Sequence, residues 1–377
     1  MFWIFFYCLE ILQIKAVKRV KEFSCKTRII SGSGACNVLK ELNSQRLFVV
    51  TDPFFEENGT AAEIAAYSSA PEIKRYSAVA PDPTVEQVAR GTAALKSFAP
   101  DTVVALGGGS TLDCAKAMVF FSGLNVTFVA IPTTSGSGSE VTDFAIVTYG
   151  GVKHPIIDEK LRPNLAILDS NLLQKLPPRL IADTGFDVLA HALEACVAVN
   201  GGAISKALAA EAFASAWQAL PRSYQGQTAV RLQMHEASCM AAMAFNSAGL
   251  GLCHAMAHAM GGLLHLPHGR LNAILLPGVV GVNQSAAGEK YAVVARSAGL
   301  GGAAEMIAVR NLKNRLIALR RELDLPATLE QAGVSRRQVM GLTDKIVQAT
   351  LADPCCATNP VAVTEDLVRQ LLKEVTA

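Results

Sequence analysis

The sequence carries little charge: 18% of its 377 residues are Asp, Glu, Lys or Arg, and the formal net charge is +2. It therefore lacks the broad basic surface typical of a nucleic-acid-binding protein, and we expect no nucleic-acid partner. The nine cysteines are scattered and form no CxxC motif, which excludes a disulfide scaffold and indicates a reducing cytoplasm. The chain also lacks internal repeats and low-complexity linkers.

Apolar residues are abundant, at 51%, and the length suits two domains or one large one. Four short apolar runs predict buried strands: 46–51, 102–106, 126–131 and 165–168. Helical stretches separate these runs, which is typical of a parallel sheet flanked by helices. After Pro177 the strand signals end and Ala-rich segments with helical periodicity follow. We expect an α/β domain at 23–176 and an all-helical domain at 177–377.

The N-terminal segment 1–22 differs from both domains. Met1 to Leu9 is almost wholly apolar, with five aromatic residues, and is too short for a membrane-spanning helix. The cations follow this stretch, whereas a secretory signal places them before it. From Leu9 onward, apolar and charged residues fall on different helical faces. We interpret the segment as an extension that either docks on a partner, a membrane surface or a protein shell, or only packs.

Two polar loops directly follow two of the predicted strands. In Gly107-Gly108-Gly109-Ser110 the glycines let a phosphate approach the backbone, and the next helix begins with free N–H groups. A plain tight turn is the alternative, since the loop is neither GxGxxG nor a Walker motif. The loop 132–140 adds hydroxyls and glycines at the end of another strand, where open α/β sheets bind ligands. Asp52 ends a third strand and either selects NAD over NADP or serves as a turn aspartate.

Four of the seven histidines lie between positions 254 and 268. Asp187 and His191 are four residues apart and therefore share one helix face. His254 and His268 would lie about 21 Å apart on an unbroken helix, so they meet at one ion only if the helix ends between them. One aspartate and three histidines then predict an Fe²⁺ or Zn²⁺ site with an open position.

The required helix break is predicted at Gly261-Gly262 and Pro267. The pair His254-x3-His258 invites comparison with HExxH proteases, but Ala255 stands where that motif needs a glutamate. Protease chemistry of that type is therefore excluded.

Four segments together resemble the iron-containing (group III) alcohol dehydrogenases, over about 24–377. They are GGGSTLDCAKA (107–117), IPTTSGSGSEVT (131–142), TGFDVLAHALEA (184–195) and AGLGLCHAMAHAMGGLLHLPHGRLNAILLP (248–277). Within the family the chain most resembles the 1-propanol dehydrogenases of propanediol-utilising bacterial microcompartments. The resemblance implies an N-terminal dinucleotide-binding domain, a helical C-terminal domain and a metal between them.

The resemblance also implies individual roles. The metal ligands are Asp187, His191, His254 and His268. His258 lies beside the nicotinamide and is catalytic, since one turn from His254 it is well placed to relay the proton. The nucleotide contacts are Asp52, Asp82, Gly108, Gly109, Ser110, Asp113, Thr133, Thr134, Ser137, Thr142 and Lys153. The substrate-pocket positions are Phe245, Leu250 and Cys355.

The implied reaction is hydride transfer between NAD(H) and a short primary alcohol or its aldehyde, with Fe²⁺, or alternatively Zn²⁺, as Lewis acid. We expect propanal reduction to 1-propanol, with NAD⁺ regeneration, inside a cytoplasmic microcompartment. Expected partners are further copies of the chain, as a dimer or larger homo-oligomer, and the shell or other encapsulated enzymes. Three alternatives stay open: a zinc polyol dehydrogenase of the glycerol type, a hydroxyacid–oxoacid transhydrogenase, and a non-enzymatic shell-docking component.

Overall fold

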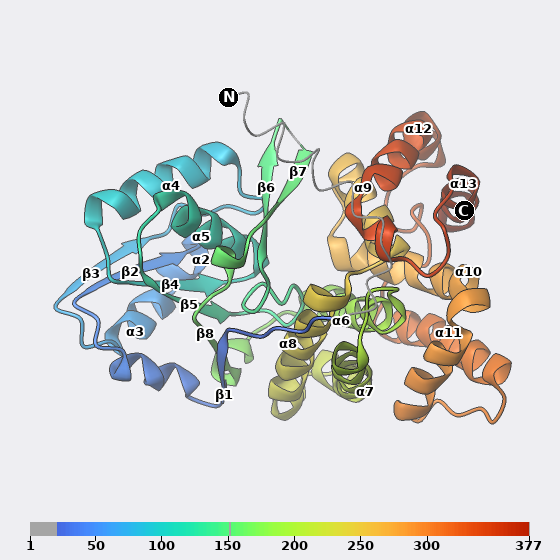
Figure 1. Ribbon diagram of the computed structural model, residues 1–377, viewed down its shortest axis with the longest axis horizontal. Coiled ribbons are helices and arrows are strands. Elements are labelled where there is room, and N and C mark those ends of the chain that lie inside the picture. The colour runs from blue at the N-terminus through green and yellow to red at the C-terminus, as the bar shows by residue number, and fades with distance from the viewer. Residues whose placement is uncertain (1–20, 151, 377) are drawn as a thin grey trace.

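The computed structural model describes residues 21–150 and 152–376 (Figure 1). A part built on a sheet lies beside a part built of helices, which confirms the predicted fold class. The interpretation of segment 1–22 falls almost entirely outside the described residues. Lys21 and Glu22 are described, and both touch the helical part: Lys21 Nζ donates to the Val199 carbonyl at 3.0 Å, and Ser247 Oγ donates to the Glu22 carbonyl at 2.6 Å.

The main sheet has six strands, all parallel, in the order β1-β8-β5-β4-β2-β3. The strands are β1 (Arg28–Gly32), β2 (Arg46–Thr51), β3 (Glu72–Tyr76), β4 (Thr102–Gly107), β5 (Thr127–Pro132) and β8 (Leu165–Asp169). The four predicted apolar runs correspond to β2, β4, β5 and β8. The sequence analysis missed β1 and β3 because they are the edge strands, where side chains stay exposed and no apolar run is needed.

Helices cover both faces of this sheet, and the strand residues alternate between the two layers. In β4, Val103 and Ala105 pack toward α4 and α5, whereas Val104 and Leu106 pack toward α3 and η2. The covering elements are η2 (Ala35–Glu41), α2 (Pro53–Glu57), α3 (Thr60–Ala66), α4 (Val85–Phe98) and α5 (Gly109–Ser122). Burial on both faces explains why the central strands are continuous apolar runs.

A two-stranded antiparallel hairpin, β6 (Phe144–Tyr149) with β7 (Val152–Ile157), projects from the sheet part (Figure 1). Thr148 of the hairpin forms a parallel bridge with Thr84, so the hairpin is tied to the start of α4. Short helices η3 (Glu159–Leu161) and η4 (Ser170–Leu173) flank β8. The hairpin also contacts α5, since the Ile146 N–H donates to Asp113 Oδ2 at 3.0 Å.

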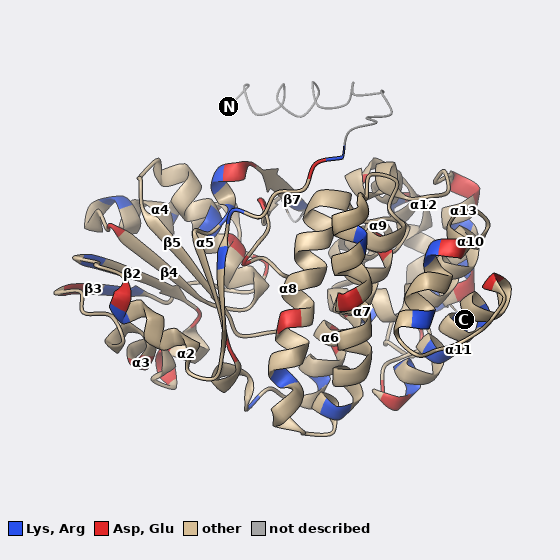
Figure 2. Cartoon of the chain, turned by 60° about the horizontal axis from the view of Figure 1, so that its bottom comes forward, with Lys and Arg blue, Asp and Glu red and all other residues tan. Residues whose placement is uncertain are grey.

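The C-terminal part is helical throughout its described residues. Its elements are α6 (Pro178–Val197), α7 (Ala203–Tyr224), η5 (Thr228–Val230), α8 (Arg231–Ala248), α9 (Leu252–Leu264), α10 (His268–Ser297), α11 (Glu305–Glu322), α12 (Arg336–Ala352), η6 (Pro354–Thr358) and α13 (Glu365–Thr376). Helices α6, α7 and α8 lie side by side (Figure 2). Their alanine-rich faces allow close approach, and α6 is buried along nearly its whole length. In the described chain, no single helix has the length and apolarity to span a membrane; one pair passes only together, bent by 102°.

The helix break needed between His254 and His268 exists, but its position differs from the prediction. Gly261 and Gly262 lie inside α9, which ends at Leu264. The chain turns at His265, which adopts a left-handed conformation (φ 55°), and Pro267 caps the start of α10. A residue after a helix commonly adopts this conformation, and a proline cannot continue the preceding helix. The prediction was therefore right for Pro267 and wrong for the glycines.

Candidate active site: a metal centre and a nucleotide edge

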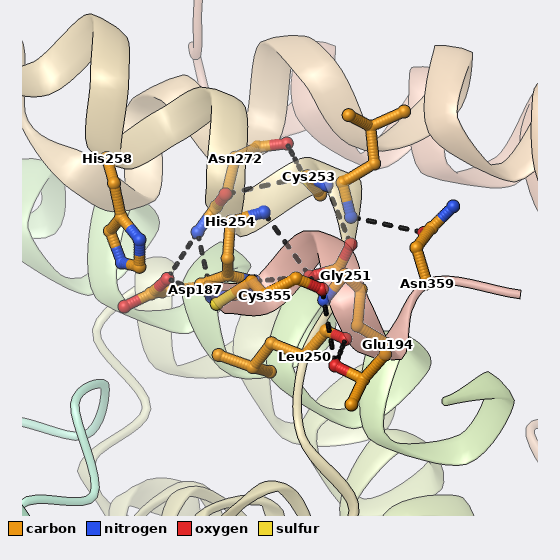
Figure 3. A network of polar contacts seen from close by, with 12 residues as sticks. Asp187, Glu194, Leu250, Gly251, Cys253, His254, His258, Asn272, Cys355 and Asn359 are labelled. Atoms are coloured by element: carbon orange, nitrogen blue, oxygen red, sulfur yellow. Dashed lines mark hydrogen bonds and ion pairs between the residues drawn. The ribbon is translucent and has the colours of Figure 1, made fainter. Parts of the chain in front are cut away.

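Three of the four predicted metal ligands converge at the meeting point of α6, α9 and α10 (Figure 3). One donor atom from each of Asp187, His254 and His268 lies within 4.8 Å of the other two. Asp187 Oδ1 is 3.6 Å from His254 Nε2 and 3.5 Å from His268 Nε2. Donors this close can bind one ion with small adjustments of their side chains.

His191 lies against this cluster. Its ring stacks on that of His254, with 4.4 Å between centroids, one helical turn beyond Asp187. His191 is buried, and its Nδ1 finds no hydrogen-bond partner among the described residues. A buried ring nitrogen without a partner is costly, and a cation bound by that nitrogen would offset the cost. The structure thus clusters three of the four predicted ligands and places His191 against them, with its ring on that of His254.

Close backbone packing fixes the place where α10 begins. A Cβ on Gly269 would lie 1.9 Å from the Asp183 carbonyl oxygen, so only glycine lets α10 approach α6 here. The next residue, Arg270, forms a buried bidentate ion pair with Asp183, at 2.6 and 3.1 Å. These two contacts hold His268 opposite Asp187, one turn farther along α6.

Glu194 is a functional residue that the sequence analysis missed. Its Oε2 lies 2.6 Å from His254 Nδ1, and the carboxylate also accepts from the backbone N–H groups of Gly251 and Cys253. A carboxylate on the second ring nitrogen orients a metal-binding histidine and leaves Nε2 free for the ion. A signal was present, because Asp187, His191 and Glu194 are spaced i, i+4, i+7 and share a helix face.

Asn272 is a second residue that was missed. Its Nδ2 lies 2.6 Å from Asp187 Oδ1, 3.3 Å from His254 Nε2 and 3.2 Å from His268 Nε2. One electropositive N–H₂ group therefore lies where the three clustered side-chain atoms converge. The spacing of four from His268 places both residues on one face of α10, which is the signal that could have identified it.

The charges of the centre follow from burial and from two carboxylates. Burial lowers the pKa of His191 to about 3 and holds that of His268 well below its usual value, so both rings are neutral and keep a lone pair. Burial also opposes a charge on His254, but Asp187 and Glu194 outweigh it and raise its pKa to about 9. The site therefore stabilises a positive charge at His254. Either a proton or a bound divalent cation can supply that charge.

These residues fit an Fe²⁺ or Zn²⁺ ion. Three imidazoles and one carboxylate are a donor set that both metals accept, and the set leaves a position open for a substrate oxygen. The buried His191 nitrogen and the Glu194–His254 pair support the assignment independently of sequence. Such a second carboxylate is typical of histidines that hold a metal.

His258 lies next to the centre and is partly exposed, unlike His254. Its ring stacks on that of His268 at 5.1 Å, and its Nδ1 lies 2.9 Å from Asp353 Oδ2. Asp353, which the sequence analysis did not identify, is mostly buried. Its carboxylate fixes the orientation of the imidazole, as is common for histidines that transfer protons.

The predicted substrate-pocket residues border the same centre. The Phe245 ring is buried, with its centroid 4.5 Å from that of His191. Leu250 is buried, Cys355 is half-buried, and both lie beside Asp187 and His254 in Figure 3. Their roles stay predictions, but apolar walls of this kind suit a short alkyl chain.

Asp52 follows β2 at the carboxyl edge of the sheet and caps α2. Its Oδ1 accepts from the Phe55 backbone N–H at 3.2 Å, and its Oδ2 accepts from Thr111 Oγ1 at 3.4 Å. Strands β2 and β4 lie side by side. After β2 the chain crosses to β3 on one side, whereas after β4 it crosses to β5 on the other side. Open α/β sheets bind nucleotides at such a switch point. Asp52 is thus both a capping residue and a residue at the nucleotide edge.

The two polar loops face each other at this edge. A Cβ on Gly109 would lie 2.8 Å from Ser137 Oγ, so glycine is needed for the approach. Gly108, Gly109, Ser110, Thr134 and Ser137 all keep some exposure there. Two further predicted contacts meet nearby: Lys153 Nζ lies 2.6 Å from Asp82 Oδ1, and the Asp82 N–H points to Ser110 Oγ at 3.4 Å.

Three other predicted nucleotide contacts lie inside the protein: Asp113, Thr133 and Thr142 are each at most 9% exposed. Asp113 accepts from Ser139 Oγ at 2.5 Å and from the Ile146 N–H at 3.0 Å. Thr142 accepts from the buried Lys116 Nζ at 2.9 Å. Burial lowers the pKa of Lys116 to about 8. In this structure these side chains hold the loops and the hairpin together, and direct contact with a nucleotide stays a prediction.

Comparison with known families and proteins places this site in context. Residues 26–170 match the model of iron-containing alcohol dehydrogenase, and residues 181–376 match the C-terminal model of the Fe-containing alcohol dehydrogenase family. The chain is 38% identical to the 1-propanol dehydrogenase PduQ of Salmonella typhimurium, over 94% of this chain and 99% of that protein. It is 34% identical to the NADPH-dependent butanol dehydrogenase of Clostridium saccharobutylicum, over 93% and 97%.

Solved structures agree with this assignment. The iron-containing alcohol dehydrogenase of Thermococcus thioreducens is 30% identical, with a TM-score of 0.87 over 94% of this chain and 99% of that one. A 1,3-propanediol oxidoreductase is 28% identical, with a TM-score of 0.89 over 95% and 100%. The chain belongs to the iron-containing alcohol dehydrogenase family. The predicted family, the alcohol dehydrogenase activity and the iron are thereby confirmed.

Proposed function

We propose that this alcohol dehydrogenase uses NAD(H) to interconvert propanal and 1-propanol. The observation that carries the proposal is the cluster of Asp187, His254 and His268, with His191 stacked on His254, in a chain 38% identical to a 1-propanol dehydrogenase over nearly its whole length. When bound, the ion supplies a Lewis acid for the substrate oxygen and the nicotinamide supplies or accepts the hydride. The protein positions both and handles the proton.

The proton route begins at His258. The imidazole is partly exposed on one side and stacks on His268 on the other, so it lies between the metal centre and solvent. Asp353 fixes its Nδ1 and thereby aims Nε2. General acid–base catalysis by a residue in this position contributes about 10²–10⁴-fold in rate.

The pocket walls support a short apolar substrate. Phe245 packs between the rings of Phe144 and His191, and Leu250 is buried beside the centre. Each buried CH₂ of a substrate gains about 0.8 kcal/mol in such surroundings, so a three-carbon aldehyde gains over acetaldehyde. A polyol would leave hydroxyl groups facing these walls, which is costly.

Steady-state kinetics across C2–C4 aldehydes, with NADH and after anaerobic Fe²⁺ loading, test the proposal. The expected result is the highest kcat/KM for propanal. A higher kcat/KM for dihydroxyacetone than for every simple aldehyde would overturn it in favour of a polyol dehydrogenase. Turnover between an alcohol and a second aldehyde without added NAD would indicate a transhydrogenase.

We further propose that the enzyme works in a bacterial microcompartment as a homo-oligomer, since two PduQ proteins, each 38% identical, are among its relatives. The apolar, aromatic segment before Lys21 is the candidate for docking on the shell. Deleting residues 1–20 should leave specific activity within about threefold, well under 1.4 kcal/mol in barrier. The deletion should also abolish co-sedimentation with shells; unchanged co-sedimentation would refute the docking role.

A further inference from the structure

A second group of metal-binding side chains lies beside the centre. His258, Asp353 and Cys355 each offer one donor atom, and these atoms lie within 4.8 Å of one another. They belong to two places in the chain: His258 is on α9, while Asp353 and Cys355 lie where α12 ends and η6 begins. None of the three is among the four ligands of the catalytic metal.

We propose that His258, Asp353 and Cys355 form a second site, which binds a thiophilic divalent cation such as Zn²⁺ and inhibits the enzyme when occupied. Nitrogen, oxygen and sulfur donors in one cluster are typical of zinc sites, in which water completes a tetrahedron. Partial exposure of all three residues gives a cation access from solvent.

The local geometry orients the donors. Asp353 Oδ1 accepts from the Cys355 N–H at 2.8 Å, which leaves Oδ2 directed at His258 Nδ1, 2.9 Å away. Cys355 lies two residues after Asp353, and its side chain is directed toward the centre in Figure 3. The carboxylate is therefore held in place before any cation arrives, so little side-chain entropy would be lost on binding.

The sulfur makes the second site chemically distinct from the first. The catalytic centre offers three imidazoles and a carboxylate, which suit Fe²⁺, whereas a thiolate favours Zn²⁺. Burial and the Asp353 carboxylate raise the pKa of the Cys355 thiol, so the thiol keeps its proton until a cation replaces it. The adjacent Cys356 is no donor here, because its Sγ is turned to the Thr350 carbonyl at 3.0 Å.

Occupancy of this site would remove the proton relay. A cation bound between His258 Nδ1 and Asp353 replaces the contact that aims the imidazole, so the ring is held by the cation and no longer positioned by that carboxylate. Inhibition therefore rests on the proposed role of His258, whereas binding itself does not. A metal count and a spectrum test the site without reference to any substrate.

The test loads the full-length enzyme anaerobically with Fe²⁺ and then adds Co²⁺ as a spectroscopic substitute for zinc. We expect the enzyme to keep its iron, to bind one further metal per chain and to show a cobalt–thiolate charge-transfer absorption. Cys356→Ser, the matched control, should behave like the unmutated enzyme. Cys355→Ser and Cys355→Ala should keep the iron but lose both the second metal and the absorption. Cobalt that only replaces iron, or equal cobalt binding by the Cys355 variants, would overturn the proposal.

A second measurement tests the inhibition. One added equivalent of Zn²⁺ should lower the turnover of the iron-loaded enzyme about tenfold, equivalent to 1.4 kcal/mol in barrier, and a chelator should reverse the effect. The Cys355 variants, each compared with its own zinc-free rate, should change less than about twofold. Equal inhibition of all variants would show that zinc acts elsewhere and would overturn the inhibitory role.

Discussion

The metal centre and the nucleotide edge of this protein differ in how many of their residues contact one another. At the centre, donor atoms of Asp187, His254 and His268 meet, His191 stacks beside them, and a carboxylate and an amide contact them from the protein side. At the edge, some of the predicted contacts keep exposure while others are buried in internal hydrogen bonds. The side chains that would bind a small ion are positioned by protein contacts alone. The edge that would bind a large ligand keeps exposed groups, which the ligand itself would cover.

The largest expected effect tests the division of labour at the metal centre. His254→Ala should lose bound metal and activity together, because it removes a ligand and leaves Glu194 buried without its partner. His258→Ala should retain the metal and turn over about 10²–10⁴-fold more slowly, since it removes only a proton relay. Metal analysis beside steady-state kinetics distinguishes the two, and equal metal loss would contradict the assignment.

Sequence reasoning could group the candidate metal ligands because helical spacing is local information. Asp187 and His191 share a face by periodicity alone, and Pro267 marks the turn before His268. The same reasoning failed where contacts join distant segments. Asp353 lies 95 positions from His258, and its role depends on a turn between α12 and η6 that no local pattern predicts.

At the nucleotide edge, too, contacts between distant segments could not be predicted from the sequence. Burial of Asp113 follows from its position on α5 opposite the hairpin, and the sequence gives no register for that packing. The edge strands β1 and β3 were missed because exposed strands need no apolar run. The fold class, by contrast, follows from the central strands, whose burial on both faces is visible in their composition.

The next largest effect concerns the stability of the nucleotide edge. Lys116→Met should lower the free energy of unfolding by about 1–3 kcal/mol, because it removes a cation that attracts the buried Asp113 carboxylate and leaves the Phe144 carbonyl without its donor. Lys96→Met, at an exposed position on α4, should cost less than about 0.5 kcal/mol. Denaturant unfolding measures both variants.

A double variant sharpens this prediction. Adding Asp113→Asn to Lys116→Met removes the stranded charge and should restore part of the lost stability. Equal stability of the single and the double variant would show that Asp113 does not depend on Lys116. Such a result would mean that packing, and not charge, stabilises the buried network. It would also favour the predicted contact between Asp113 and the nucleotide.

A smaller effect is expected at the support of the metal centre. Glu194→Gln keeps the side-chain volume but removes the charge beside His254 Nδ1, and should weaken metal binding about 10–100-fold. The exposed Glu211→Gln on α7 is the matched control and should leave metal affinity unchanged. Competition with a chelator of known affinity gives both values. Unchanged affinity in Glu194→Gln would show that Glu194 supports the fold rather than the metal.

The smallest effect is expected at Asp52, whose charge faces the nucleotide edge. A like charge at ~4 Å in an effective dielectric near 20 costs about 4 kcal/mol before screening, so the enzyme should prefer NAD to NADP without excluding it. Asp52→Gly should raise the kcat/KM ratio of NADP over NAD about tenfold. Glycine is also a tolerated helix cap, so α2 loses only a few tenths of a kcal/mol. A relative that is 34% identical is NADPH-dependent, so the preference for NAD must be measured for this enzyme. Equal use of both cofactors by the unmutated enzyme would show that Asp52 serves only as the cap of α2.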